Sequence, residues 1–432
     1  MREIHWNQPI TQQSVAQLLP RANVSSDLDS VVAKIILEVK TNGSKALKDH
    51  ADKFDGVIPS EFRISSPKLR IALESIPSDV RDAMEQSIAR LRQVSLSHLP
   101  TDKSMEVSLG GQVELRFVPF DSAGVYAPGG KAVYPSSVIM NVVPAQVAGV
   151  RRIVLCSPAQ KEYGGDPHPL ILAAAELLGI EEVYAIGGAS AIAALAEGID
   201  DIGLEKVDLV TGPGNAYVAT AKQLLRSKIA IDSEAGPTEI LIIADEKANP
   251  KWIAADLISQ AEHDESAAAV LLSTSSKLIE EVKQEIELQL AKTANRERAT
   301  KALSGEQSAL VLVESISDAI EIANLYATEH LEIQTERPRD VLQKITNAGA
   351  VFLGGYSPVS LGDYLAGSNH VLPTSGQARR SSGLSVYTFL RQQQVVDFES
   401  DALVEVSDLL TKFADAEGLP AHGEAARIRF SN

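Results

Sequence analysis

The sequence has only one cysteine, Cys156, in 432 residues, and this scarcity excludes several kinds of site. A single cysteine cannot form an intramolecular disulfide, a CxxC redox pair or a thiolate zinc cage. A bound metal would therefore need histidine, carboxylate and amide ligands. Cys156 ends an apolar stretch, where we expect it to pack as a small hydrophobic residue.

Positive charge and long apolar runs are also scarce. The 40 Lys and Arg residues against 57 Asp and Glu residues give a net charge of −17, which argues against nucleic acid or anionic membrane as a partner. No apolar run approaches the ~18 residues of a membrane helix. The first residues, Met1–Trp6, lack the apolar core of a secretory signal, so we expect a soluble, cytoplasmic protein.

Short apolar strands alternate with helices over residues 126–355, which is typical of parallel α/β sheets. The first series of strands is expected at 152–156, 182–186, 207–210 and 229–232, with helices near 168–178, 189–197 and 215–226. The second series is expected at 239–244, 268–272, 309–313 and 350–354, with helices near 252–264, 276–290, 316–328 and 338–346. This rhythm predicts two Rossmann-like parallel-sheet units in tandem.

The chain is too long for one ordinary core, so several domains are expected. The expected divisions are an N-terminal arm (1–23), a larger α/β domain (24–125 plus 238–380), a Rossmann-like domain (126–237) and a C-terminal tail (381–432). Apolar residues at helical spacing predict helices over 30–52 and 78–97. We expect these helices to pack on the second sheet unit, and the tail to be helical after a polar turn.

The first polar constellation is the segment 259–264. Gln260 and His263 are three residues apart on an expected helix, so they share a face and can reach one metal ion. The alternative interpretation is a polar helix end with a capping histidine.

A second constellation is the adjacent pair Glu329 and His330, which follows an apolar helix. Such a pair at a helix–loop junction suggests acid–base chemistry. A histidine near a helix C-terminus can equally interact with the helix dipole or cap the helix.

Two further constellations lie nearer the C-terminus. The loop 360–374 gathers Asp363, Ser368, Asn369 and His370 just after an expected strand, where α/β folds bind ligands. The segment 417–423 contains Glu417 and His422, and taken alone it is typical of a solvated tail.

Glycine-bearing turns at 124–130, 187–190 and 212–217 follow or adjoin expected strands, and the last two could present backbone N–H groups to a phosphate. None is a GxGxxG fingerprint, so they are weak evidence for a nucleotide. The turn 234–239 joins the two sheet units, where a cleft would form. The other histidines, His5, His50, His98 and His168, are expected to be solvated or structural.

Taken together, these segments resemble the histidinol dehydrogenase family over nearly the whole chain. The motifs that carry the resemblance occur in the family's order: 124–130, 134–145, Gly212-Pro-Gly-Asn215, Gln260-Ala-Glu-His263, Glu329-His-Leu-Glu332, Gly362-Asp-Tyr364, Gly367-Ser-Asn-His370 and Glu417-Gly-Leu-Pro-Ala-His422. The resemblance implies an aldehyde-dehydrogenase-like arrangement of the two sheet units. It also implies oxidation of L-histidinol through L-histidinal to L-histidine, with two NAD, as the last steps of histidine biosynthesis.

The resemblance also implies roles for individual residues. The implied ligands of one zinc ion are Gln260, His263, Asp363 and His422. The implied substrate contacts are these four with Thr238, His330, His370 and Glu417. The implied contacts of NAD are Tyr126, Ser190 and Asn215. His330 is the implied base and Glu329 the implied activator of water, and zinc orients the substrate. In the family the tail residues come from the other subunit, which implies a homodimer with shared active sites.

Two positions depart from the family pattern. Ser190 stands where glutamine is usual, and this puts the affinity for NAD in question. Thr238 stands where serine is usual, which keeps the hydroxyl and adds a methyl group.

Three alternative functions remain open. They are a related zinc and NAD dehydrogenase acting on another small alcohol, such as a sulfonated diol, a zinc hydrolase, and a non-catalytic α/β binding protein. A hydrolase would have no use for the nucleotide-type turns.

Overall fold

The computed structural model describes residues 1–21, 28–129, 133–233 and 236–430, and the chain divides into two compact units. The first unit comprises Met1–His98 and Asp121–Phe389, and the second comprises Leu99–Phe120 and Leu390–Asn432. Three features of the sequence analysis fall outside the described residues. These are the expected boundary at 23–24, Gly130 of the first glycine turn, and Glu234 with Ala235 in the turn that joins the sheets.

The first sheet has five parallel strands in the order β6-β5-β4-β7-β8. The strands are β4 (Ser122–Tyr126), β5 (Arg152–Ser157), β6 (Glu182–Ala185), β7 (Leu209–Thr211) and β8 (Ala230–Ile231). Its following helices are α6 (Pro135–Ala148), α7 (Pro169–Leu177), α8 (Gly188–Glu197) and α9 (Ala216–Leu225). The expected strands and the three expected helices of this half are confirmed, and Cys156 is fully buried in β5.

Two elements of this half were not expected, β4 and α6. Helix α6 is buried on every side, so its sequence shows no polar face to mark a helix. Strand β4 contains Gly124, which looked like part of a turn. A Cβ at Gly124 would lie 2.9 Å from the side chain of Leu195, so the glycine lets α8 approach this central strand.

The N-terminal helices pack on the first sheet unit, so the expectation that they pack on the second is wrong. Helix α2 (Leu28–Asn42) contacts α8 and α9, α4 (Ser66–Ser75) contacts α7, and α5 (Ser78–His98) contacts α6. The buried side chains of Val32, Val39 and Leu47 share one apolar core with α8. Amphipathic spacing predicts a buried face but does not say which sheet will cover it.

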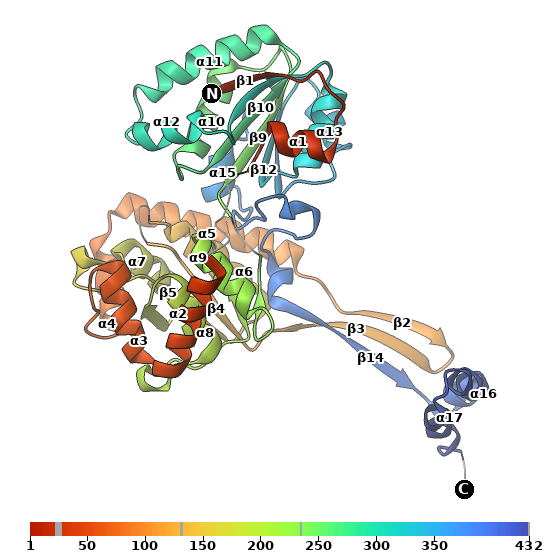
Figure 1. Ribbon diagram of the computed structural model, residues 1–432. Coiled ribbons are helices and arrows are strands. Elements are labelled where there is room, and N and C mark those ends of the chain that lie inside the picture. Colours follow the sequence, from red (N-terminus) through yellow and green to blue (C-terminus); the bar gives the residue numbers. More distant parts are fainter. Residues whose placement is uncertain (22–27, 130–132, 234–235, 431–432) are drawn as a thin grey trace. The chain divides into compact units, whose positions relative to one another are not determined.

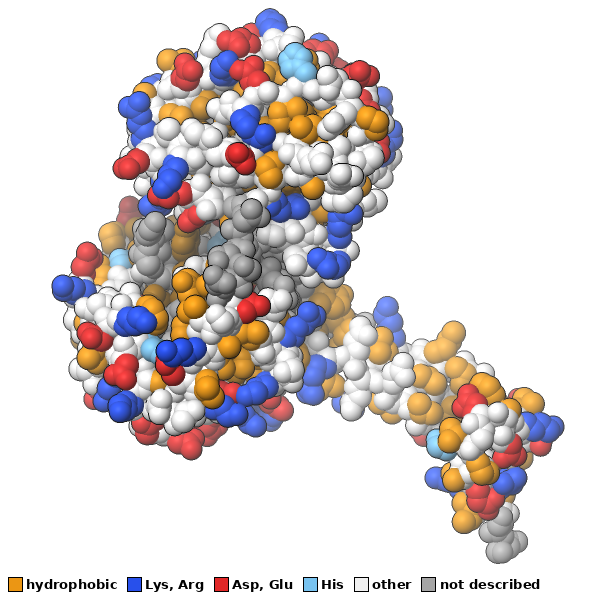
Figure 2. Space-filling view, in the orientation of Figure 1, with side chains coloured by type: hydrophobic (Ala, Val, Ile, Leu, Met, Phe, Trp, Pro, Cys, Tyr) orange, Lys and Arg blue, Asp and Glu red, His pale blue; other side chains and the backbone are white. Residues whose placement is uncertain are grey.

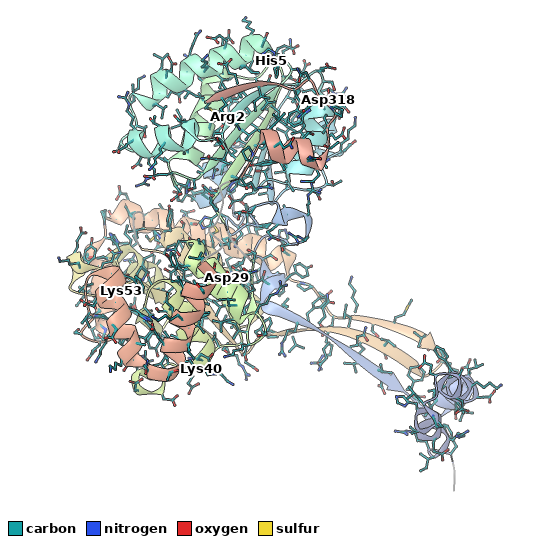
Figure 3. The ribbon with its side chains drawn as sticks, in the orientation of Figure 1. Arg2, His5, Asp29, Lys40, Lys53 and Asp318 are labelled. Atoms are coloured by element: carbon teal, nitrogen blue, oxygen red, sulfur yellow. The ribbon has the colours of Figure 1, made fainter. Side chains whose placement is uncertain are left out.

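The expected helix over 30–52 is interrupted. Gly43, with φ 52°, separates α2 from α3 (Ser44–His50), and a π-helical turn (Ala51–Asp55) follows. Asp29 lies in the first turn of α2 and Lys40 in its last turn, each favourable for the helix dipole (Figure 3).

The second sheet has six parallel strands in the order β1-β11-β10-β9-β12-β13. The strands are β1 (Arg2–His5), β9 (Glu239–Ala244), β10 (Ala268–Ser273), β11 (Ala309–Leu312), β12 (His330–Gln334) and β13 (Ala350–Leu353). The helices are α1 (Gln12–Leu18), α10 (Pro250–Ala261), α11 (Ser276–Leu290), α12 (Arg296–Ser304), α13 (Ile316–Tyr326), α14 (Pro338–Leu342) and α15 (Val359–Tyr364). Helices α10, α11 and α12 cover one face, and α1 and α13 cover the other (Figure 1).

The expected N-terminal arm is part of this second sheet. Strand β1 pairs with β11, and its residues Arg2 and His5 lie along the edge of the sheet (Figure 3). Trp6, Val15 and Leu19 are buried in the core beneath α13. The first residues of the chain therefore help to close one edge and one face of the sheet.

The junction after α13 also differs from the expectation. Ala327, with φ 52°, ends the helix, and His330 begins β12 instead of a loop. Strand β12 pairs with both β9 and β13, so it is an interior strand. The expected strands at 239–244, 268–272, 309–313 and 350–354 are confirmed.

The second unit is an antiparallel sheet, β14-β3-β2, with two helices that follow β14 in sequence. Its elements are β2 (Lys103–Ser108), β3 (Gly111–Pro119), β14 (Leu390–Phe398), α16 (Ser400–Ala416) and α17 (Pro420–Arg427). The tail helices are confirmed, but the strands were not expected: β2 and β3 form a local hairpin, and β14 pairs with β3, which lies far earlier in the sequence. Exposed apolar side chains gather on these helices (Figure 2), including Val404, Leu409 and Phe413.

Four short 3-10 turns complete the regular structure of the described residues: Lys161–Tyr163, Asp200–Ile202, Gln377–Arg379 and Val386–Phe389. None of the described helices is both long and apolar enough to cross a membrane.

Candidate active site

A cavity of about 1470 Å³ lies in the first unit, and residues of both parallel-sheet halves line it. Nine residues singled out from the sequence line this cavity: Tyr126, Ser190, Asn215, Thr238, His263, Glu329, His330, Asp363 and His370. A tenth, Gln260, is buried and donates a hydrogen bond to Thr238. The volume exceeds that of ordinary small-ligand pockets, so the cavity has room for more than one small molecule.

Thr238 connects two of the expected site residues. Gln260 Nε2 donates to Thr238 Oγ1, and Thr238 Oγ1 donates to Glu329 Oε2 at 2.5 Å. The amide nitrogen of Gln260 is thereby occupied, while its Oε1 is buried and has no hydrogen-bond partner among the described residues. A buried amide oxygen without a partner is costly unless a ligand meets it.

The backbone of Glu239, the first residue of β9, holds both members of the Glu329–His330 pair. Its N–H donates to Glu329 Oε2 at 2.9 Å, and its carbonyl oxygen lies 3.1 Å from His330 Nδ1. A carbonyl can only accept, so Nδ1 carries the proton of this hydrogen bond. In the neutral ring, Nε2 then holds the lone pair. Nε2 has no hydrogen-bond partner in the described structure.

Burial changes the proton affinities of this pair. Burial raises the pKa of Glu329 to about 8, although the hydrogen bond from Thr238 opposes that change. Burial also lowers the pKa of His330, so the imidazole is the neutral, proton-accepting form at neutral pH. A carboxyl whose pKa is raised toward neutral pH, next to a neutral imidazole, is typical of acid–base sites.

Asp363, His263 and His370 surround the same part of the cavity. Burial raises the pKa of Asp363 to about 6, while His330 nearby favours its ionised form. Burial is also the main cause that lowers the pKa of His263, and it lowers that of His370 to about 4. His370 is fixed on both ring nitrogens. Nδ1 lies 3.1 Å from the Asp363 carbonyl oxygen, and Nε2 lies 3.2 Å from Ser137 Oγ.

The side chains of Gln260, His263 and Asp363 fit a metal ion by their chemistry. They offer one amide oxygen, one neutral imidazole and one carboxylate, a mixed donor set of the kind that zinc accepts. Among the described residues, no group of three or more His, Cys, Asp or Glu side chains could hold a metal. The expected set contributes only two such side chains, His263 and Asp363, from this unit.

The local structure around Gln260 and His263 differs slightly from the expectation. Helix α10 ends at Ala261, so His263 lies just beyond it, and its N–H donates to the Gln260 carbonyl at 3.3 Å. This hydrogen bond continues the helical spacing, so Gln260 and His263 remain about one helical turn apart. Asp363, expected in a loop, lies in the short helix α15.

The other side of the cavity is formed by the turns that follow strands of the first sheet. The hydroxyl of Tyr126 accepts a hydrogen bond from Gly188 N at 3.0 Å, and Asn215 caps α9 through its side-chain oxygen. Gly212 has φ 116°, and a Cβ there would lie 2.1 Å from the Tyr126 carbonyl oxygen. The third glycine turn can therefore pack against β4 only as glycine.

Ser190 has a hydrogen-bond partner that no local sequence pattern indicates. His50 Nδ1 lies 2.9 Å from Ser190 Oγ, and His50 Nε2 lies 2.9 Å from Glu38 Oε2. Because a carboxylate only accepts, Nε2 carries a proton, and in the neutral ring the Ser190 hydroxyl donates to Nδ1. His50 was expected to be solvated or structural, and it is a buried residue of the cavity wall.

Other residues that sequence reasoning missed support different parts of the site. Lys222 is fully buried in α9, and its ammonium donates to Gly212 O at 2.6 Å and to Asp232 Oδ1 at 2.5 Å. Arg21 donates to Glu239 Oε1 at 2.7 Å. The ring of Tyr134 is parallel to that of His263, and the two ring centroids lie 6.2 Å apart. Of these three residues, only Tyr134 belongs to a motif of the sequence analysis, the segment 134–145, so only Tyr134 could have been found from the sequence.

Glu417 and His422, the two remaining expected site residues, belong to the second unit. Glu417 follows α16 and His422 lies in α17, and both are exposed. His168 was expected to be solvated or structural. It caps the start of α7, where its Nδ1 accepts a hydrogen bond from Leu170 N at 3.1 Å.

Comparison with known proteins identifies the family. The sequence model described as histidinol dehydrogenase matches residues 20–430. The histidinol dehydrogenase of Corynebacterium diphtheriae is 51% identical over 430 residues, covering 98% of this chain and 95% of the relative. That of Leifsonia xyli subsp. xyli is 50% identical over 421 residues, covering 97% of each chain.

Solved structures agree with this result. A histidinol dehydrogenase from Elizabethkingia anophelis matches with a TM-score of 0.94 and 35% identity, covering 100% of this chain and 98% of the other. An acetylating aldehyde dehydrogenase from Geobacillus thermoglucosidasius matches with a TM-score of 0.50 and 15% identity, covering 90% and 97%. The second match concerns the fold alone and confirms the aldehyde-dehydrogenase-like arrangement. From its motifs, its fold and these relatives, the chain belongs to the histidinol dehydrogenase family.

Proposed function

We propose that this chain oxidises L-histidinol through L-histidinal to L-histidine, using two NAD and one water, in the last steps of histidine biosynthesis. The observation that carries the proposal is the arrangement of Thr238, Glu329 and His330 at one cavity, in a chain of this family. Two successive hydride removals at one carbon need a base that regains its starting form between them. They also need a second group that handles the water.

His330 suits the role of base. Its Nδ1–H is held on the Glu239 carbonyl, so Nε2 is the nitrogen that can take the hydroxyl proton of the substrate. Its lowered pKa keeps it neutral before each step, and lets it lose the proton again afterwards. The same nitrogen can therefore act in both oxidations.

Glu329 suits the proton transfers of the hydration step. A carboxyl with its pKa raised to about 8 exchanges its proton close to neutral pH. The hydrogen bonds from Thr238 and the Glu239 amide fix the position of Oε2. The carboxylate form would then accept a proton from water as that water adds to the aldehyde.

Gln260, His263 and Asp363, with His422 of a second copy of the chain, would hold one zinc ion. When bound, the ion would hold the imidazole and amino group of histidinol in place. The free Oε1 of Gln260 is the observation that favours this assignment. Thr238 and His370 would contact the substrate directly, together with Glu417 from the second copy.

NAD would bind on the side of the cavity formed by residues 126–237, in contact with Tyr126, Ser190 and Asn215. The Ser190 hydroxyl, directed at His50, has its lone pairs left as acceptors. It would therefore receive a donor group of the cofactor or a bridging water, which a shorter side chain allows.

A homodimer with exchanged tails would bring Glu417 and His422 to the partner's cavity. The exposed apolar side chains of α16, including Val404, Leu409 and Phe413, support such an association, because isolated copies would leave them in water.

The test is the stoichiometry of NADH. Purified protein with zinc, NAD and a limiting amount of L-histidinol should produce two NADH for each histidinol, with L-histidine as the product. One NADH per molecule, or none with the substrate intact, would contradict the proposal. A sulfonated diol oxidised in preference would favour a relative with another substrate. Metal-dependent hydrolysis without NADH would indicate a zinc hydrolase, which no observation here favours.

A further inference from the structure

A cluster of two buried and one half-buried polar side chains lies outside the cavity lining, on the face of the second sheet covered by α10. Its members are Asp256 of α10 and Glu332 and Gln334 of β12. Glu332 is 1% exposed and Gln334 is 6% exposed. A fully buried carboxyl next to a half-buried one needs an explanation, because burial of polar groups is costly unless their hydrogen bonds are made.

The cluster is joined by hydrogen bonds. Gln334 Nε2 donates to Asp256 Oδ2 at 3.0 Å and to Glu332 Oε2 at 2.8 Å. The two carboxyl groups also hydrogen-bond to each other. Two ionised carboxylates cannot share a hydrogen bond, so one proton is held between them. Burial agrees with this, since it raises the pKa of both Asp256 and Glu332.

Glu332 also reaches a third element. Its Oε1 accepts a hydrogen bond at 3.1 Å from Val359 N, the first N–H of α15. The first N–H groups of a helix have no partner within the helix, so this carboxyl completes the start of α15. One side chain on β12 is thus bonded to both α10 and α15.

Each of the three joined elements also carries a residue of the site. On α10, Gln260 lies one turn after Asp256, on the same face. On β12, His330 lies two residues before Glu332, so both side chains leave the same face of the strand. On α15, Asp363 lies one turn after Val359. On each element, the cluster residue therefore lies two to four positions from the base or from one of two proposed metal ligands.

We propose that Glu332, bonded to Asp256, Gln334 and the amide of Val359, is a positioning residue that fixes the spacing of α10, β12 and α15 for metal binding. This inference rests on the proposed zinc site of Gln260, His263 and Asp363. Metal affinity depends on the distances among ligands, and groups that orient the ligands commonly change affinity about 10- to 100-fold when removed. A purely structural cluster would change stability without this loss.

The experiment compares three variants with the unaltered protein, each measured for zinc affinity by chelator competition and for thermal stability without metal. Asp256→Leu removes the link between α10 and β12. Asp256→Asn keeps it, since an amide can donate to Glu332 and accept from Gln334. Asn324→Leu is the matched control. Asn324 is likewise part-buried in the second sheet half and bonds the backbone of Lys344, Thr346 and Asn347, but has no bond to α10, β12 or α15.

We expect Asp256→Leu to weaken zinc binding about 10-fold or more, Asp256→Asn to bind within a few-fold of the unaltered protein, and Asn324→Leu to lose stability alone. Equal zinc affinity in Asp256→Leu and the unaltered protein would overturn the inference. So would an equal loss in Asn324→Leu. If Asp256→Leu does not fold, Gln334→Leu replaces it. We expect this variant to lose less zinc affinity, and zinc affinity equal to that of the unaltered protein would again overturn the inference. An unaltered protein that binds no zinc would instead contradict the proposed metal site itself.

Discussion

The hydroxyl of Thr238 lies between Gln260 and Glu329, accepting from the first and donating to the second at 2.5 Å. One hydroxyl thereby orients a proposed metal ligand and a proposed proton-transfer group. Threonine stands here instead of the serine usual in the family, and its hydroxyl makes both hydrogen bonds.

Replacing Thr238 by valine keeps the shape of the side chain and deletes both hydrogen bonds. We expect kcat/KM for L-histidinol to fall about 10- to 100-fold, because two buried groups lose a partner. Zinc affinity should fall as well, since the Gln260 amide is no longer held. Thr238→Ser is the control and should retain both properties. Unchanged kinetics in the valine variant would show that the hydroxyl is dispensable.

Removal of the base should affect chemistry more than binding. His330→Ala is expected to lower kcat about 10²- to 10⁴-fold, with KM changed much less, in steady-state NADH assays. His98→Ala provides the control, since His98 is exposed at the end of α5. A variant of His330 with near-normal kcat would rule this residue out as the base.

The raised pKa of Glu329 predicts a pH dependence of stability. The folded state holds this proton up to about pH 8, whereas an unfolded glutamate releases it near its ordinary pKa of 4.5. Between those pH values the folded state binds more protons, so the contribution of Glu329 to stability falls as pH rises. The slope is at most about 1.4 kcal/mol per pH unit for one proton.

Glu329→Gln removes this titration. The difference in unfolding free energy between the variant and the unaltered protein, measured by denaturant unfolding without metal from pH 5 to 8, should shift in favour of the variant as pH rises. A difference that stays constant across this range would mean that Glu329 is ionised throughout in the folded protein.

Shared active sites can be tested by complementation. His422→Ala and His330→Ala should each be inactive alone. In a mixed dimer with exchanged tails, one cavity combines an intact His330 with the partner's intact His422, so activity should return at one of the two sites. A purified heterodimer without activity would indicate that each tail serves its own cavity, or none.

Much of the fold was readable from local patterns, and the failures have physical causes. The strands at 239–244 and 268–272 are continuous apolar runs because parallel strands are covered on both faces. Helix α6 and strand β4 escaped notice for related reasons, since a helix buried all round has no period and Gly124 resembles a turn. Strand β14 was missed because its partner β3 is remote in sequence.

The site was predictable where residues stand in motifs and not where they meet only in space. Gln260 and His263 share a turn, and Glu329 and His330 are neighbours, so spacing alone suggested them. His50 meets Ser190 across 140 positions, and Asp256 meets Glu332 across 76, pairings that no local pattern records. Glu417 and His422 entered through family resemblance alone.

The burial of Cys156 has a practical consequence. Burial raises the pKa of this thiol, so the protein as it stands offers no thiol that reacts readily with maleimides. A cysteine introduced at the exposed position Glu405 of α16 would then be the sole labelling site. Donor- and acceptor-labelled preparations, mixed and followed by energy transfer, would report whether two copies of the chain associate and how fast they exchange.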